Sequence, residues 1–195
     1  MKTNAYVAGI GMTPFARYLE RPLKSIAGVA ISAALKDAGL EAREIQAAYM
    51  GNAVAGLVTG QEMIRGEVVL RSLGMGGIPV INIENACASS STALQQACAM
   101  ITAGFHDVVL ICGYEKLSHH DKAISLGAFS SAVDVEDAEG AAKVAGDMAK
   151  ELGIDWAGPD PRRSVFMDIY AMLATEHMQK YGSTQQHFAQ VAVKN

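Results

Sequence analysis

The stretch that decides the fold is Ile78–Leu94, IPVINIENACASSSTAL. Its first half is a Val/Ile run bounded by Pro79, which predicts a buried strand. After Asn85 the chain turns to small residues and then to an Ala/Leu pattern that is typical of a helix. Cys87 lies at this strand-to-helix junction, so we take it as the first candidate for chemistry.

The junction itself gives a physical reason for a reactive cysteine. A cysteine in the turn that opens a helix faces backbone N–H groups without an intrahelical partner, and the helix dipole adds positive potential there. Both effects favour the nucleophilic thiolate, and the same N–H groups can hold the oxyanion formed when sulfur attacks a carbonyl carbon. The neighbours of Cys87 are all small, which permits close approach: Ala86, Ala88, Ser89, Ser90 and Ser91. The alternative is that Cys87 is a buried small hydrophobe, as free cysteines often are.

Composition narrows the class of protein. The chain has 195 residues, half of them hydrophobic, which is enough for a real core in about one to one and a half typical domains. A formal net charge of −4 without a basic block argues against nucleic acid or an anionic membrane surface as a partner. Three cysteines without metal-ligand spacing fit a reducing compartment, so we expect a cytoplasmic protein. The cluster His119, His120, Asp121 lacks a fourth ligand, and we expect no metal and no permanently bound cofactor.

Apolar runs and helical patterns alternate along the first part of the chain. The predicted strands are Ala5–Ile10, Ala47–Val54, the run before Cys87, and Asp107–Cys112. The predicted helices are Pro22–Ala38 with Gly39 as its cap, Gln61–Leu73, and the helix from Cys87 to Ala103, capped by Gly104. This alternation predicts an α/β fold with a parallel sheet, and it places Cys87 at the carboxyl end of a strand, where such sheets bind ligands.

The character of the sequence changes beyond Gly113. Residues 114–131 are polar and predict no regular element, whereas the Ala-rich stretch up to Leu152 predicts a surface helix. WAGPDPRR, Trp156–Arg163, reads as an ordered loop with two exposed arginines. Met167–Lys180 predicts a helix that ends at Gly182, and a last helix runs from the cap at Ser183 or Thr184 to Asn195.

Four segments resemble the thiolase superfamily in the same order along the chain. They are VAGIGMTPFAR, NIENACASSSTALQQA, DVVLICGYEKLSH and EHMQKYGSTQQHFAQVAVKN. Asn85, two residues before Cys87, is similar to the branch of sterol-carrier-protein-type thiolases and lipid-transfer-like proteins. The resemblance implies a thiolase-like βαβαβ half, with a parallel-rich sheet sandwiched by helices, plus part of a helical loop region. We expect residues 1–117 to be the amino-terminal core, incomplete and without its last strand, and residues 118–195 to be part of the loop region.

The sequence departs from the family pattern in two ways. Ser90 stands where the family usually has a glycine, which makes close backbone approach harder. The resemblance covers only the amino-terminal half, and the second-half motifs that carry the activating histidine and the second cysteine are absent from these residues. We therefore expect the 195-residue chain alone to turn over poorly or not at all.

The resemblance implies a role for each candidate residue. Cys87 would carry an acyl group from a coenzyme A thioester, for Claisen condensation or for thiolytic cleavage of 3-ketoacyl-CoA. Arg162 and Arg163 would contact the phosphates of coenzyme A, and Tyr170 would line the acyl pocket. The intact protein is expected to form a homodimer, and the resemblance to this branch implies a small partner protein as the alternative.

Two alternatives remain open from the sequence. One is a non-catalytic subunit that binds acyl-CoA or lipid and keeps the fold without the chemistry. The other is a thiolase-fold retro-aldolase that acts on steroid-like acyl-CoA together with a small partner protein.

Overall fold

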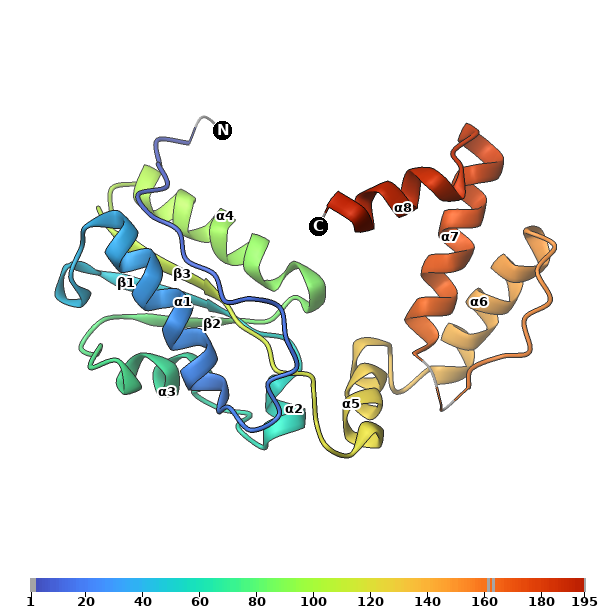
Figure 1. Cartoon of the computed structure of the whole chain (residues 1–195), viewed down its shortest axis with the longest axis horizontal. Coiled ribbons are helices and arrows are strands. Elements are labelled where there is room, and N and C mark those ends of the chain that lie inside the picture. Colours follow the sequence, from blue (N-terminus) through green and yellow to red (C-terminus); the bar gives the residue numbers. More distant parts are fainter. Residues whose placement is uncertain (1–2, 161, 163, 195) are drawn as a thin grey trace. The chain divides into compact units, whose positions relative to one another are not determined.

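The computed structural model describes residues 3–160, 162 and 164–194, and the chain divides into two compact units, Met1–Ala128 and Phe129–Asn195. The first unit contains, in order, α1 (Leu23–Ala38), β1 (Ala47–Gly51), α2 (Ala55–Thr59), α3 (Arg65–Ser72), β2 (Val80–Ile83), α4 (Ser89–Thr102), β3 (Val109–Gly113) and α5 (Lys122–Ala128) (Figure 1). The second unit contains α6 (Ala138–Glu151), α7 (Val165–Tyr181) and α8 (Gln185–Lys194). Short 3-10 turns cover Ala42–Glu44, Ala86–Ala88 and Phe129–Ala132.

The described strands form one parallel sheet in the order β2-β1-β3. The central strand β1 is buried along its whole length, as expected for a strand with neighbours on both edges and helices on both faces. Gly51 at its end pairs with Ile83 of β2 and with Gly113 of β3. All three strands therefore end at the same edge of the sheet, and the parallel α/β prediction is confirmed.

Helices cover both faces of this sheet (Figure 1). On one face, Ile31 of α1 and Leu70 of α3 pack against Met50 of β1 in a single apolar core. On the other face, Ala93 and Ala97 of α4 belong to a second buried cluster that also includes β1 and β2 residues. Successive β1 residues alternate between the two clusters because strand side chains point to opposite faces. The prediction of a sheet sandwiched by helices is thus confirmed.

Glycines end the helices where the sequence predicted. Gly39 after α1 adopts a φ of 68°, and its N–H donates to the carbonyls of Leu35 and Lys36. Gly104 after α4 and Gly182 after α7 are also left-handed, with φ values of 77° and 70°. Only glycine reaches this region without a steric penalty, so these three positions confirm the predicted helix ends.

The predicted first strand, Ala5–Ile10, is wrong for this structure. The segment forms no strand, and the side chains of Tyr6, Val7 and Ile10 are exposed. Its backbone lies on α1 instead, where the Ile10 N–H donates to an Asp37 carboxylate oxygen at 2.9 Å. A Cβ at Gly9 would overlap the α1 backbone, so the missing side chain permits this position.

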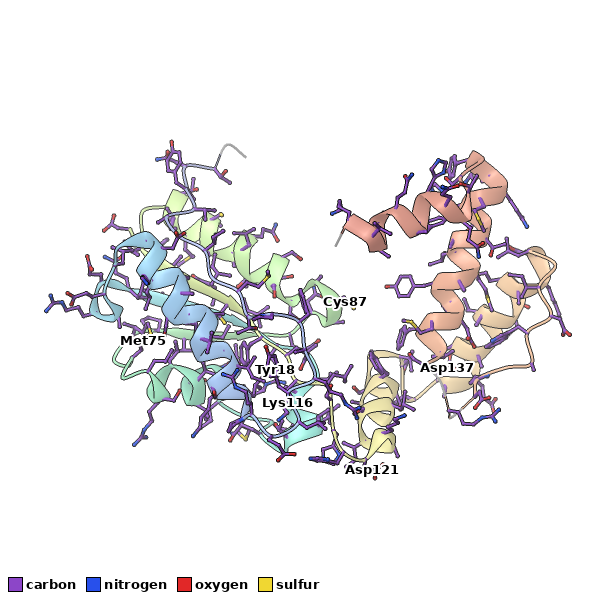
Figure 2. All side chains as sticks on the ribbon, in the orientation of Figure 1. Tyr18, Met75, Cys87, Lys116, Asp121 and Asp137 are labelled. Atoms are coloured by element: carbon purple, nitrogen blue, oxygen red, sulfur yellow. The ribbon has the colours of Figure 1, made fainter. Side chains whose placement is uncertain are left out.

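The second unit is a set of helices with little buried apolar surface. The Asp137 side chain caps α6 by accepting the Gly140 N–H at 2.9 Å (Figure 2). Trp156 donates its indole N–H to Asp168 of α7 at 2.9 Å, which holds the loop before α7. The helices expected here from the sequence are present. Helix α5 contacts α2 and so belongs to the first unit, and the sequence did not predict this helix.

Candidate active site

Cys87 lies on a sharp turn between β2 and α4, at the edge where the three strands end. Strand β2 stops at Ile83, a 3-10 turn covers Ala86–Ala88, and α4 begins at Ser89. The Cys87 side chain is exposed, at the tip of the loop that precedes α4 (Figure 2). The structure therefore has the strand-turn-helix arrangement that the sequence predicted, and the alternative of a buried packing cysteine is excluded for Cys87.

The residue before the cysteine has an unusual backbone conformation. Ala86 adopts a φ of 44°, in the left-handed region that L-residues other than glycine rarely occupy. The Ser89 hydroxyl stabilises the turn because it donates to the Ala86 carbonyl at 2.8 Å and accepts the Asn85 N–H at 2.9 Å. Ser89 is only 5% exposed, so this hydroxyl is fully used inside the turn.

The turn leaves one backbone donor beside the sulfur. The Ala88 N–H donates to the Asn85 carbonyl at 2.8 Å, and the Ser89 N–H donates to the Ala86 carbonyl. Among the described residues, no acceptor is placed on the Cys87 N–H. A substrate oxygen next to the Cys87 thiol would therefore find this N–H available.

Ser90 is accommodated by two glycines at the ends of the central strands. A Cβ at Gly51 would lie 3.1 Å from the Ser89 carbonyl carbon and from the Ser90 nitrogen. A Cβ at Gly113 would collide with the Ser90 Oγ. Helix α4 thus approaches the paired residues Gly51 and Gly113 directly, and the room that Ser90 needs comes from the sheet.

A polar network that the sequence did not predict ties the same edge of the sheet together. Asn52, which follows β1 and is 3% exposed, donates to the Tyr114 carbonyl at 2.6 Å and accepts from the Arg65 guanidinium at 2.8 Å. The Glu115 carboxylate accepts the N–H groups of Ala53 and Val54 at 3.1 and 3.0 Å. These bonds join the ends of β1 and β3 to the start of α3.

The other two cysteines are placed differently. Cys112 in β3 is buried, and this burial raises the pKa of its thiol to about 12. It therefore stays protonated and unreactive at neutral pH. Cys98 is partly buried along α4. Packing roles for both residues agree with the sequence interpretation.

The predicted substrate-binding residues lie in the second unit. Tyr170 on α7 is 58% exposed, next to the turn that carries the exposed Met167. The Arg162 guanidinium is exposed and forms a close ion pair with Asp160, with Nη2 2.7 Å from a carboxylate oxygen. Arg163 lies outside the described residues.

The histidine cluster is engaged in local contacts. The His120 ring nitrogen lies 2.8 Å from a Glu20 carboxylate oxygen, and a His119 ring nitrogen accepts the Asp121 N–H at 3.0 Å. Within residues 3–160, 162 and 164–194, no group of three or more His, Cys, Asp or Glu side chains could hold a metal ion. None of the helices in this described part is long and apolar enough to cross a membrane.

Fold and site together define an α/β protein with an exposed cysteine on a strand-turn-helix elbow at the carboxyl edge of a parallel sheet. Residues 5–195 match the family described as Thiolase, N-terminal domain, and the chain belongs to the thiolase family.

Curated relatives extend over almost the whole chain. An acetyl-CoA acetyltransferase of Methanothermobacter thermautotrophicus is 31% identical over 189 residues, which cover 97% of this chain and 43% of the relative. A non-specific lipid-transfer protein-like 2 of Caenorhabditis elegans is 32% identical and covers 100% of this chain and 44% of its own length. The benzoylsuccinyl-CoA thiolase subunit BbsB of Thauera aromatica is 31% identical, with 100% and 43% covered. The chain thus spans less than half the length of these relatives.

Proposed function

We propose that this chain supplies the acyl-accepting part of a thiolase-type acyl-CoA acyltransferase, with Cys87 as the nucleophile. The observation that carries the proposal is the exposed Cys87 on the elbow, with its own N–H left without an acceptor in the described chain. Membership of the thiolase family supports the same role. A relative named acetyl-CoA acetyltransferase supports acyl-CoA as the substrate class.

The proposed chemistry begins with attack by the Cys87 thiolate on the thioester carbonyl carbon of acyl-CoA. A bond forms between the Cys87 sulfur and that carbon, and the bond between the carbon and the sulfur of coenzyme A breaks. Coenzyme A leaves as its thiol with the proton that Cys87 gave up, and the acyl group stays on Cys87. The Cys87 N–H stabilises the carbonyl oxygen while it carries negative charge. Covalent capture divides one difficult step into two easier ones.

The second step transfers the acyl group onward. In the synthetic direction, the enolate of a second acyl-CoA attacks the acylated Cys87; in the reverse direction, coenzyme A cleaves a 3-ketoacyl-CoA. The family resemblance assigns the acid-base groups for this step to second-half motifs that these 195 residues lack. We therefore expect the chain alone to form the adduct but to turn over poorly or not at all, and measurable thiolysis by the purified chain would contradict this.

Substrate contacts are proposed for the second unit. Tyr170 offers an exposed aromatic side chain for the acyl pocket. Arg162 and Arg163 are proposed to bind coenzyme A phosphates, although the pairing of Arg162 with Asp160 means that a phosphate must compete with a carboxylate. Coenzyme A thioesters act here as substrates rather than as a resident cofactor.

We further propose a cytoplasmic protein that assembles with other chains. A homodimer is the expected assembly, and a small partner protein remains the alternative. The Thauera aromatica relative, whose name describes it as a thiolase subunit, supports assembly with another chain.

Mass spectrometry of the intact protein after incubation with acetyl-CoA or acetoacetyl-CoA tests the nucleophile directly. We expect a gain of one acetyl group on the peptide that contains Cys87, and none in Cys87→Ala. Cys98→Ala is the matched control and keeps the adduct. A folded wild-type protein that gains no acetyl group would overturn the proposal.

A second candidate function is acyl-CoA or lipid binding without catalysis. The relative named as a lipid-transfer-like protein favours it. This function predicts acyl-CoA binding that survives Cys87→Ala, with no adduct on the wild-type protein. A retro-aldol activity would be recognised by cleavage of 3-hydroxyacyl rather than 3-ketoacyl thioesters.

A further inference from the structure

We propose that Glu84 is a positioning residue for Cys87 and acts through the backbone of Ala86. This inference rests on the proposed acyl transfer at Cys87. Glu84 follows the last residue of β2, and its carboxylate Oε1 accepts the Ala86 N–H at 2.5 Å. The Glu84 side chain is exposed, so packing in the core does not account for its position.

Two side chains hold Ala86 from its two sides. The Glu84 carboxylate binds the N–H that precedes the Ala86 Cα, and the Ser89 hydroxyl binds the carbonyl that follows it. The φ and ψ angles of Ala86 set the rotation between these two peptide groups, so the two bonds together hold Ala86 in the conformation whose φ is 44°. An L-residue without such support leaves this region because its Cβ crowds the backbone.

The conformation of Ala86 decides where the Cys87 N–H points. That N–H belongs to the same planar peptide group as the Ala86 carbonyl, so both turn together. Because Glu84 occupies the Ala86 N–H, the neighbouring donor that remains beside the sulfur is the Cys87 N–H. We infer that Glu84 directs this donor toward the carbonyl oxygen of the thioester.

Glu84 contributes an acceptor oxygen for the Ala86 N–H. Glu84→Gln keeps an acceptor oxygen at this place and removes the charge, whereas Glu84→Ala removes both. A comparison of these two variants isolates the acceptor.

The experiment compares two reagents at Cys87 of the full 195-residue chain at one pH. S-phenyl thioacetate transfers its acetyl group to Cys87 and releases thiophenol through an oxyanion, so it needs the Cys87 N–H. Iodoacetamide alkylates the sulfur at a saturated carbon and forms no oxyanion. Peptide mass spectrometry measures the rate of acylation and the rate of alkylation. Because exposure and ionisation of the thiol affect both rates, their ratio reports the effect of the Cys87 N–H alone. If Glu84 contributed only to the stability of the fold, its substitution would leave this ratio unchanged.

We expect the ratio of acylation to alkylation to fall about tenfold in Glu84→Ala, because a displaced oxyanion donor loses much of its effect. Glu84→Gln should keep the ratio within about twofold of the wild type, since its amide oxygen still accepts. Glu176→Ala, at an exposed glutamate of α7, is the matched control and should leave the ratio unchanged. If the alanine variant does not fold, Glu84→Met replaces it with a side chain of similar length and only a weak acceptor.

An unchanged ratio in the folded alanine or methionine variant would overturn the role of Glu84. An equal fall in the glutamine and alanine variants would also overturn it, because charge rather than the acceptor would then be responsible. The acetyl-CoA experiment separates this inference from the proposed function. A wild-type protein without an acetyl-CoA adduct, but with a ratio that depends on Glu84, refutes the proposed acyl transfer alone; an adduct with an unchanged ratio refutes Glu84 alone.

Discussion

The two units of the chain differ in how much apolar side-chain surface they bury. In the first unit, large side chains such as Met50 and Leu70 are completely buried on one face of the sheet. In the second unit, the buried hydrophobic residues among those described are Ala145, Ala149 and Met172. Burial of apolar surface is the main favourable term in folding, so the first unit has the more rigid framework. The unit that carries Cys87 is therefore the one best able to hold a strained turn.

The largest expected difference is between the alkylation rates of Cys87 and Cys112, which both lie in the first unit. Because burial raises the pKa of the Cys112 thiol to about 12, roughly one molecule in ten thousand carries the Cys112 thiolate at pH 8. We expect iodoacetamide to label Cys87 at least about a thousand times faster than Cys112 in the native protein, as measured by peptide mass spectrometry. The raised pKa also means that a change from pH 7 to pH 9 leaves Cys112 protonated. Labelling in denaturing urea is the control, and similar native rates at both cysteines would contradict the buried placement of Cys112.

Core substitutions test the difference between the units more directly. Leu70→Ala should lower the free energy of unfolding by about 2–5 kcal/mol, because it opens a cavity between α3 and β1. Hydrogen-deuterium exchange should accelerate in β1 and β3 of this variant. Met172→Ala should accelerate exchange in α6 and α7 while β1 keeps its protection. Equal acceleration of β1 in both variants would show that the units do not open separately.

The polar network at the edge of the sheet gives a smaller effect. Asn52→Ala should cost about 1–3 kcal/mol, because the buried Tyr114 carbonyl and the Arg65 guanidinium each lose a partner. Urea unfolding measures the change. Asn4→Ala is the control at an exposed position, where the backbone N–H keeps its bond to Thr102. Equal stability of both variants would mean that the Asn52 bonds do not contribute.

The smallest effect is expected at the start of α6. Asp137→Ala should destabilise this helix by about 1 kcal/mol, because the Gly140 N–H loses its cap. Faster hydrogen-deuterium exchange should be confined to the first turn of α6. Asp137→Asn should behave almost like the wild type, since its amide oxygen also caps. Exchange in the alanine variant that matches the wild type would contradict the cap.

Much of the fold could be predicted because its signals are local. Glycine at positions 39, 104 and 182 marks helix ends through a backbone angle that glycine alone adopts freely. The apolar runs around Tyr49 and Leu110 predict buried strands because both faces of the sheet are covered. The same reasoning failed for Ala5–Ile10. An apolar run reports the preference of a segment but not which partner its backbone takes, and here the Ile10 N–H bonds to Asp37 of α1.

The candidate site could be predicted only in part. The position of Cys87 follows from one continuous stretch of sequence, and the structure places the residue on the expected turn. The bond from Asn52 to the Tyr114 carbonyl joins residues 62 positions apart, and no local pattern predicts it. The left-handed Ala86 could not be predicted either, because alanine gives no sign of that conformation and its support comes from the side chains of Glu84 and Ser89.

The two strand glycines that α4 contacts make the position of Cys87 sensitive to substitutions in the sheet. Gly51 and Gly113 carry no functional group, yet the first turn of α4 lies directly on them. A methyl group at Gly51 would press on the backbone of Ser89 and Ser90, so the first turn of α4 would have to shift and Cys87 would move with it. A methyl group at Gly113 would meet the Ser90 side chain instead, so this substitution is accommodated when that side chain turns away or becomes smaller.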